Sequence, residues 1–318
     1  MNNTALILGA TGGIGGEMAR QLLAAGWQVR ALRRTDPPSP GSDNITWLRG
    51  DAMVRADVLA AAEGCSVIVH AVNPPGYRNW NKLVLPMIDN TITAAQASGA
   101  TIVLPGTVYN YGIDAFPVLQ EDSPQHPATR KGAIRVELEA RLERSVAGGA
   151  RVLIVRAGDF FGPQAGNSWF AQGLVKPGEP VRTIQSPGAP GIGHQWSYLP
   201  DVARTMVELL AMRSSLAPFA RFHLAGHWDH DGRQMTNAIA SVVRQATGHA
   251  PKIKPFPWWL MSLTAPFVAT LRELREMRYL WKTPVRMDNA RLLAVLGHEP
   301  HTPLELAVKT TLEGMGNL

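Results

Sequence analysis

The chain has 318 residues, of which 45% are hydrophobic and 18% charged, and its formal net charge is +6. This length allows a large core, built either as one domain or as a domain with a smaller lobe. The basic residues are dispersed, without the dense stripe typical of nucleic-acid-binding proteins, so we expect no nucleic-acid partner. The single Cys65 excludes an internal disulfide, and its apolar surroundings indicate a small buried side chain.

An apolar run, Thr4 to Leu8, is followed by glycines in a G-x-x-G-x-x-G spacing and by a helical stripe that ends at Gly26. Gly9 allows a sharp turn, Gly12 lets the backbone approach a pyrophosphate, and Gly15 lets the helix lie against the strand. The helix N-terminus adds unpaired N–H groups. The motif predicts a dinucleotide site formed by Gly9, Thr11, Gly12, Gly13, Ile14 and Gly15; the alternative is a strand-to-helix turn without a ligand.

The second predicted strand, Gln28 to Leu32, ends in Arg33 and Arg34. In an NAD site this position is usually acidic and accepts hydrogen bonds from the ribose 2′-OH, whereas a basic residue suits a 2′-phosphate. The pair therefore favours NADP over NAD. Arg30 belongs to the same local cluster, and a phosphorylated small-molecule partner would explain the cluster too. The alternative is an exposed basic loop, which the prolines after Asp36 make plausible.

Strands and helices continue to alternate up to Arg156. The predicted strands span 45–48, 66–69, 101–104 and 152–156, and the predicted helices span 53–63, 81–98 and 128–146. This alternation is typical of right-handed crossovers in an α/β fold with a Rossmann-type, doubly wound parallel sheet. We expect residues 1–157 to form an NADP-binding domain, to which some later segments return.

From about Gly158 prolines and glycines become frequent, and only short strands are predicted, at 181–184 and 195–198. This pattern indicates a smaller C-terminal α/β lobe, residues 158–318, that mainly binds the substrate. A helix over 201–212 would begin with Asp201 as its N-cap. A strand over 219–224, a helix over 234–247 and a mostly helical tail from Ala265 complete the chain.

Several motifs, in this order along nearly the whole chain, resemble the extended short-chain dehydrogenase/reductase family, which includes NAD-dependent sugar-nucleotide epimerases and dehydratases. They are the glycine turn, Gly50-Asp51, Val69-His70-Ala71, the segments 107–112, 156–163 and 198–203, and Leu296 to Pro300. The resemblance implies that Asp51 and Ala52 lie at the adenine, that Ala71, Val72 and Asn73 lie beside the nicotinamide ribose, and that Thr107 provides the active-site hydroxyl.

The chain departs from the family where a Tyr, with a Lys four residues on, donates the proton. Lys131 occupies the Tyr position and Arg135 the Lys position, and there is no Tyr between Tyr111 and Tyr198. The chain therefore resembles an atypical member of the family.

Three interpretations follow. In the first, the protein is an NADP(H)-dependent oxidoreductase of a small carbonyl or hydroxyl compound. Its proton then comes from Tyr109 or Tyr111, or from Lys131, whose pKa the cationic Arg135 would lower. In the second, it binds NADP(H) without catalysis and acts as a redox sensor or regulator. In the third, Lys131 and Arg135 are surface residues of a charged helix that also contains Glu139. A nucleotide-sugar epimerase or dehydratase is a further alternative.

The substrate class stays open between two interpretations of the residues 256–271, an almost wholly apolar stretch. Trp258, Trp259, Met261, Leu263 and Phe267 favour a hydrophobic carbonyl substrate, or they simply form the core of the lobe. The stretch is too short to span a bilayer and contains two prolines, so we expect no membrane span.

The turn from His227 to Asp231 contains ligand-type side chains but has no recognised metal spacing. We therefore expect no metal there and a polar turn closed by Gly232, or a contribution to the substrate mouth. His298 and His301 should be exposed. A signal-peptide pattern is lacking, so the expected location is the cytoplasm. The expected partner is a small-molecule substrate, and a homodimer is allowed.

Overall fold

The computed structural model describes residues 3–36, 44–74, 79–166, 168–259 and 276–318. The chain divides into two units. Unit 1 comprises Met1–Asn110, Arg130–Arg156 and Ala203–Phe222, and unit 2 comprises Tyr111–Thr129, Ala157–Val202 and His223–Leu318. The units are of similar length, so the second is not the smaller lobe expected from sequence. Residues 111–129 belong to unit 2, although the chain on both sides of them belongs to unit 1. Residues 203–222 belong to unit 1, although the chain on both sides of them belongs to unit 2. Sequence periodicity does not reveal this exchange.

In the described part of unit 1, a seven-stranded sheet has the order β11-β7-β5-β4-β1-β2-β3. Its strands are β1 (Thr4–Leu8), β2 (Gln28–Arg33), β3 (Ile45–Arg49), β4 (Val67–His70), β5 (Thr101–Gly106), β7 (Arg151–Arg156) and β11 (Phe219–His223). Every neighbouring pair from β3 to β7 is parallel. The order of the strands reverses between β1 and β4, which is where open sheets of this kind bind ligands.

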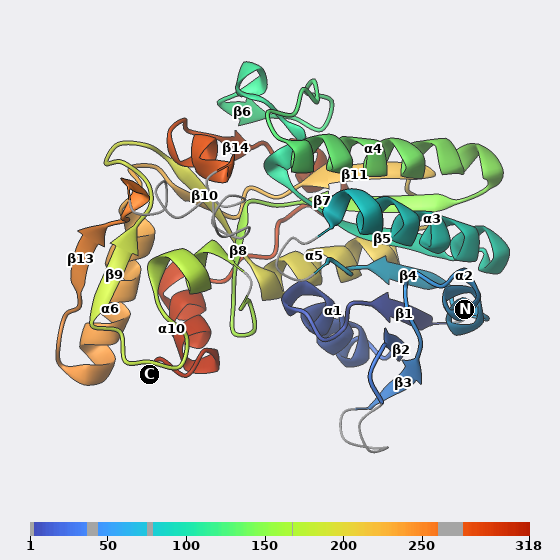
Figure 1. Cartoon of the computed structure of the whole chain (residues 1–318), viewed down its shortest axis with the longest axis horizontal. Helices are drawn as coiled ribbons and strands as arrows, with labels where there is room; N and C mark the ends of the chain where they lie inside the picture. Colours follow the sequence, from blue (N-terminus) through green and yellow to red (C-terminus); the bar gives the residue numbers. More distant parts are fainter. Residues whose placement is uncertain (1–2, 37–43, 75–78, 167, 260–275) are drawn as a thin grey trace. The chain divides into compact units, whose positions relative to one another are not determined.

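Helices cover both faces of this sheet. They are α1 (Gly13–Ala24), α2 (Arg55–Ala62), α3 (Trp80–Ser98, with Pro86 inside), α4 (Arg130–Ser145) and α5 (Leu199–Ala211). Figure 1 shows α3 and α4 on one face and α1 and α5 on the other. On the first face α2, α3 and α4 pack in a row, over a core that includes Leu6, Ile88 and Leu138. The predicted Rossmann-type, doubly wound α/β fold is confirmed.

The first strand and helix follow their sequence patterns closely. All five residues of β1 are buried, as expected for a central parallel strand covered on both faces. In α1 the buried positions include Met18, Ala19 and Leu22, which is the predicted apolar stripe. The helix gives way to Gly26, whose positive φ of 77° suits a glycine after a helix.

Unit 2 contains smaller sheets. β10 (His194–Tyr198) pairs with β8 (Asp159–Phe161) in parallel and with β12 (His227–Asp229) in antiparallel. Parallel pairs also join β9 (Thr183–Ser186) to β13 (Lys252–Pro255) and β6 (Val118–Leu119) to β14 (Arg286–Met287). The helices are α6 (Gln234–Thr247), α9 (Ala290–Leu296) and α10 (Leu304–Gly314), and α6 packs against α10.

An aromatic cluster fills the described interior of unit 2. Phe161 stacks on Phe170, and Trp281 packs against both Trp169 and Trp196. Most of the apolar stretch 256–271, including Met261, Leu263 and Phe267, lies outside the described residues. Within the described part, Trp258 packs against Trp169, whereas Trp259 is 69% exposed.

The predicted N-cap role of Asp201 is wrong. Helix α5 begins at Leu199, so Asp201 lies in the first turn rather than before it. Its carboxylate accepts hydrogen bonds from the Thr302 backbone N–H (2.7 Å) and hydroxyl (2.8 Å). Asp201 therefore holds the loop before α10.

Candidate functional site

The glycine turn connects β1 to α1 within unit 1. Gly9 has a φ of +95°, and its carbonyl accepts a hydrogen bond from the Gly12 N–H at 3.0 Å. Gly12 precedes the helix, and no side chain caps it there. The N-terminal N–H groups of α1, with the positive end of the helix dipole, thus form an anion-binding geometry without a competing side-chain oxygen.

The glycines differ in the space around them. A Cβ on Gly9 would lie 2.7 Å from the Ala71 carbonyl, and one on Gly15 would lie 2.2 Å from the Gly9 carbonyl oxygen. A Cβ on Gly12 would meet only the Gly9 oxygen, at 3.4 Å. Gly9 and Gly15 are thus required by backbone packing, whereas Gly12 faces open space. This cradle fits the pyrophosphate of a dinucleotide.

The predicted ribose-contacting residues lie beside this turn. The Ala71 N–H donates to the Leu8 carbonyl at 2.9 Å, and the Gly9 backbone approaches both Ala71 and Val72 closely. Asn73 follows on the same segment. The structure therefore brings the ends of β1 and β4 together at the reversal of strand order.

Asp51 and Ala52 follow β3. The Asp51 N–H donates to the Asp57 carboxylate at 2.8 Å, and the Ala52 carbonyl accepts a hydrogen bond from the amide of Asn90 at 2.9 Å. Asn90 is buried on α3, and its hydrogen bond to Ala52 anchors this loop to the helix. Nothing in the sequence separates Asn90 from an ordinary polar residue of α3, so its role was not predicted.

The three arginines predicted as one cluster do not act together. The Arg30 guanidinium donates to the Glu63 carbonyl at 2.7 Å, at the end of α2. Arg33, half-buried at the end of β2, lies over the ring of Trp47, and Arg34 is exposed. The basic character at the end of β2 thus comes from Arg33 and Arg34.

A buried ion pair contacts the backbone of Thr107, the residue predicted to provide the active-site hydroxyl. The Arg156 guanidinium donates to both carboxylate oxygens of Glu139, at 2.9 and 2.7 Å, and to the Thr107 carbonyl at 2.7 Å. In the third interpretation Glu139 lies on a solvated helix face, but in the structure it points into unit 1. Glu137 makes the surface pair with Arg141 instead. The signal for this role was only the position of Glu139, eight residues after Lys131 on one helix face.

Lys131 is not the surface residue of the third interpretation. It lies in the first turn of α4 and is only 4% exposed. Its Nζ is 5.9 Å from the centre of the Trp80 ring, and the Arg135 guanidinium is 5.2 Å from the same ring. Lys131, Arg135 and Glu139 are spaced four residues apart, so they share one face of the helix. Trp80 was not predicted to take part.

The two tyrosines differ in accessibility. Tyr109 is half-buried, and its backbone N–H donates to the Thr107 hydroxyl at 3.4 Å. Tyr111 is fully buried in unit 2, where its hydroxyl meets His223 Nε2 at 3.3 Å. Its phenol is thus part of the unit 2 interior, whereas Tyr109 belongs to unit 1.

His70 ends β4 and is neutral. Burial, with a contribution from the nearby Arg135 charge, lowers its pKa to about 3. Its Nδ1 is 2.8 Å from the Thr91 hydroxyl on α3. Burial thus favours the neutral imidazole, and the positive charge near it comes from Arg135.

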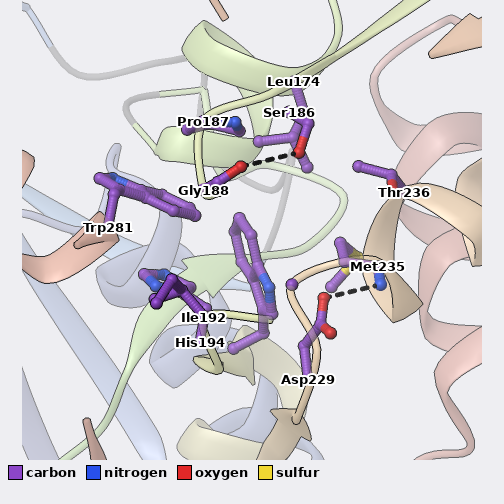
Figure 2. A pocket seen from close by; sticks show the side chains of 12 residues that line it. Leu174, Ser186, Pro187, Gly188, Ile192, His194, Asp229, Met235, Thr236 and Trp281 are labelled. Carbon is purple, nitrogen blue, oxygen red and sulfur yellow. Dashed lines mark hydrogen bonds between the residues drawn. The ribbon is translucent and has the colours of Figure 1, made fainter. Parts of the chain in front are cut away.

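A small cavity in unit 2 is shown in Figure 2. His194 stacks flat on Trp281 with ring centres 3.7 Å apart, and its Nε2 meets Asp159 at 2.8 Å. The cavity measures about 10 Å³. Because a single water needs roughly 10–15 Å³, this space cannot hold a substrate.

The turn from His227 to Asp231 is a structural cap. The Asp229 carboxylate accepts hydrogen bonds from the backbone N–H groups of Arg233, Gln234 and Met235 at the start of α6. Gly232 has a φ of +72°, as expected for the residue that closes this turn. Among the described residues, no group of three or more His, Cys, Asp or Glu could hold a metal. His298 and His301 are exposed, as expected.

Residues 9–157 match a family model described as NAD(P)H-binding. The strand order and the glycine cradle of unit 1 are those of a Rossmann-type nucleotide-binding fold. The fold predicted from the sequence motifs is also that of solved epimerase structures. In the portion of the chain that the structure describes, no helix combines the length and apolar character needed to cross a membrane.

Two curated relatives are similar in sequence. A 3-diazoavenalumate denitrifying reductase from a Streptomyces species is 31% identical over 176 residues, which cover 51% of this chain and 57% of the relative. A dTDP-6-deoxy-L-talose 4-dehydrogenase (NAD(P)(+)) from Kitasatospora kifunensis is 29% identical over 173 residues, 51% of this chain and 54% of the relative. The chain thus spans about half the length of the curated relatives it matches.

The solved structure of MoeE5 in complex with UDP-glucose and NAD is similar over 98% of both chains, with a TM-score of 0.72 and 18% identity. At this level of identity the likeness shows the fold alone.

Proposed function

We propose that the protein is an NADP(H)-dependent oxidoreductase acting on a small carbonyl or hydroxyl compound, with Lys131 as its proton donor. The nicotinamide cofactor, when bound, supplies or accepts the hydride. The turn from Gly9 to Gly15 would hold the pyrophosphate, Asp51 and Ala52 the adenine, and Ala71 to Asn73 the nicotinamide ribose. The basic Arg33 and Arg34 favour NADP over NAD.

The burial of Lys131 is the observation that supports this function best. A lysine that is 96% removed from water carries a large desolvation cost, and the face of Trp80 offsets part of it. Arg135 shares the same ring, which places a second cation one helical turn away. Such an arrangement is typical of groups that exchange protons rather than of surface residues.

In the reductive direction, the Thr107 hydroxyl would hydrogen-bond the substrate oxygen, and the Lys131 ammonium would donate its proton to that oxygen. Arg135 would stabilise negative charge on the oxygen as the proton transfers. Arg156 keeps the Thr107 carbonyl in place, and the same guanidinium holds α4 through Glu139. Tyr109 is the alternative donor, since it follows Thr107 by two residues and is only half-buried.

The test combines binding and turnover. NADPH and NADP⁺ affinities would be measured by fluorescence, and turnover against a panel of aldehydes, ketones and nucleotide sugars. We expect Lys131→Ala to lower kcat by about 10²–10⁴-fold, the range for loss of a general acid, with little change in NADPH affinity. Tyr109→Phe should keep most of the activity. The exposed Lys82, also in unit 1, provides a matched control as Lys82→Ala.

Other outcomes would favour the alternatives. Tight NADPH binding without turnover across the whole panel would favour a non-catalytic redox sensor or regulator. Turnover confined to nucleotide sugars would favour an epimerase or dehydratase, in line with the MoeE5 likeness and the name of the Kitasatospora relative. Activity that survives Lys131→Ala but not Tyr109→Phe would make Tyr109 the donor.

A further inference from the structure

We infer that Trp47 and Thr35 hold the Arg33 guanidinium as a preformed receptor for the 2′-phosphate of NADP(H), and that Arg33 rather than Arg34 sets the cofactor preference. This inference deepens the proposed function and rests on it. It identifies two positioning residues that neither the sequence motifs nor the family match mark.

Trp47 covers one face of the guanidinium. Arg33 pairs with Arg49 in the β2–β3 register, so Trp47, two residues earlier on β3, is its diagonal neighbour on the same sheet face. The Arg33 Cζ lies 5.3 Å from the centre of the indole ring. This is within the range of a cation–π contact, which fixes the plane of the guanidinium against the sheet.

Thr35 fixes the rotation of the guanidinium within that plane. The Thr35 hydroxyl oxygen accepts hydrogen bonds from Arg33 Nε (2.9 Å) and Nη2 (2.6 Å). A guanidinium has five N–H bonds in one plane, and these two form one of its edges. The remaining N–H bonds are the two on Nη1 and one on Nη2, and one from each nitrogen forms an edge that can bind phosphate through two parallel hydrogen bonds.

The charges nearby are compatible with a bound phosphate. The acidic residue closest in sequence is Asp36, and its carboxylate pairs with Arg49 at 3.0 Å. Both partners are well exposed, so water screens that pair. Arg34 is exposed and therefore contributes a more mobile charge than the stacked Arg33.

Holding the side chain in advance matters because an arginine otherwise loses rotamer freedom when it binds. The resulting gain in affinity depends on the 2′-phosphate, so it should appear for NADPH and not for NADH. A residue with a merely structural role would instead weaken both cofactors equally. The ratio of the two dissociation constants therefore distinguishes the two roles.

The experiment measures binding, without any substrate. Dissociation constants would be obtained by fluorescence titration for NADPH and NADH, and by calorimetry for adenosine 2′,5′-bisphosphate and AMP. For Trp47→Leu we expect NADPH and the bisphosphate to bind about tenfold more weakly, with NADH and AMP unchanged. Thr35→Val should act in the same direction, and Trp47→Phe should restore most of the preference because it keeps an aromatic face.

Arginine variants complete the set. Arg33→Ala should remove most of the preference for NADPH, and Arg33→Lys should not restore it, because an ammonium lacks the bidentate geometry. Arg34→Ala should change the ratio only a few-fold. Arg213 lies 5.3 Å from the Trp27 ring in the same unit, so Arg213→Ala is a matched control that should leave the ratio unchanged.

The outcomes separate the two proposals. A wild-type protein that binds NADH more tightly than NADPH would overturn the proposed NADP preference itself. A wild-type protein that prefers NADPH, together with a Trp47→Leu variant that loses NADPH and NADH affinity equally, would overturn the role of Trp47. A larger effect of Arg34→Ala than of Arg33→Ala would overturn the assignment to Arg33.

Discussion

Arg156 is 1% exposed, and its guanidinium links a strand end, a helix and a loop through Glu139 and Thr107. Such a pair is not in itself a source of stability, because removing both charges from water costs about as much as their attraction returns. Its effect is geometrical, since it fixes the helix face that also contains Lys131 and Arg135. The buried pair thereby couples the candidate catalytic lysine to the candidate hydroxyl of Thr107.

Removing one partner of this ion pair should lower the free energy of unfolding more than replacing both partners with apolar residues. Glu139→Ala leaves the Arg156 charge buried without its carboxylate, and we expect the free energy of unfolding to fall by about 3–5 kcal/mol. The double variant Glu139→Leu with Arg156→Met should be less destabilised than the single variant. Urea denaturation of the three proteins checks this. A loss below about 1 kcal/mol in Glu139→Ala would contradict the description of a desolvated pair.

His227 gives a pH dependence with a definite sign. Burial, with a contribution from the nearby His301, lowers its pKa from 6.5 to about 4. Between these values the unfolded chain binds a proton that the native state does not, so acid favours unfolding. The contribution of His227 to stability is thus fully present above about pH 6.5 and is lost progressively as the pH falls from about 6.5 to about 4.

We therefore expect the free energy of unfolding of the wild type, relative to His227→Gln, to fall by about 2 kcal/mol between pH 7.5 and 4.5. Urea denaturation at a series of pH values measures this difference. The exposed His249 provides a control, and His249→Gln should follow the wild-type curve. A pH-independent difference between the wild type and His227→Gln would count against a neutral, buried His227.

At the scale of the element, two glycines of the turn between β1 and α1 have different roles, one in backbone packing and one in cofactor binding. In Gly15→Ala the new Cβ would meet the backbone of Gly9, so the turn or the helix must shift. In Gly12→Ala the added Cβ has ordinary contact distances, and the backbone φ of −93° suits alanine. Gly15 thus belongs to the fold and Gly12 to the surface that a cofactor would approach.

We accordingly expect Gly15→Ala to lower the melting temperature by several degrees and, as a consequence, to weaken NADPH binding. In a protein of about this size, a loss of about 1 kcal/mol in the free energy of unfolding lowers Tm by roughly 2–4 °C. Gly12→Ala should keep the wild-type melting temperature and bind NADPH about tenfold or more weakly. Thermal unfolding and NADPH titration distinguish the two. Equal melting temperatures for both variants would show that the packing contact at Gly15 relaxes easily.

The elements that sequence predicted best are those whose local pattern and tertiary environment agree. The bounds of β1 and α6 are confirmed as predicted, because each has an unbroken apolar pattern with a clear stop at Gly9 or Gly248. Lys131 and Glu139 were harder, because the alternating charges of α4 resemble those of a solvated helix. Their burial depends on Trp80 and Arg156, residues 51 and 17 positions away in the sequence. Pairing at such distances leaves no local pattern.

At the scale of the whole molecule, the chain crosses between its two units repeatedly. The helix and strand that return to unit 1, in residues 203–222, place β11 beside β7. The sequence predicts that later segments return to the first domain, and the structure identifies them as residues 203–222. A change in composition, such as the one at Gly158, marks where the chain leaves a unit and does not mark where it comes back.

This crossing predicts the behaviour of a fragment. Residues 1–157 alone, the part that ends with the family match, lack β11 and leave the edge of β7 uncovered. Because an uncovered strand edge promotes association, we expect the fragment to aggregate or to melt at a clearly lower temperature than the full chain. Size-exclusion chromatography and circular dichroism measure this. A monomeric fragment with the full-chain melting temperature would show that β11 is dispensable for unit 1.

Cys65 has a practical consequence. Its thiol is buried at the end of α2, and burial raises its pKa, so the thiolate that reacts with labelling reagents is scarce. We therefore expect the native protein to react only slowly with maleimide dyes and spin labels. New cysteines at the exposed positions Met212 in unit 1 and Ile253 in unit 2 would accept a label pair without prior removal of Cys65. Energy transfer between those labels would record, in solution and in real time, whether the two units move when NADPH is added.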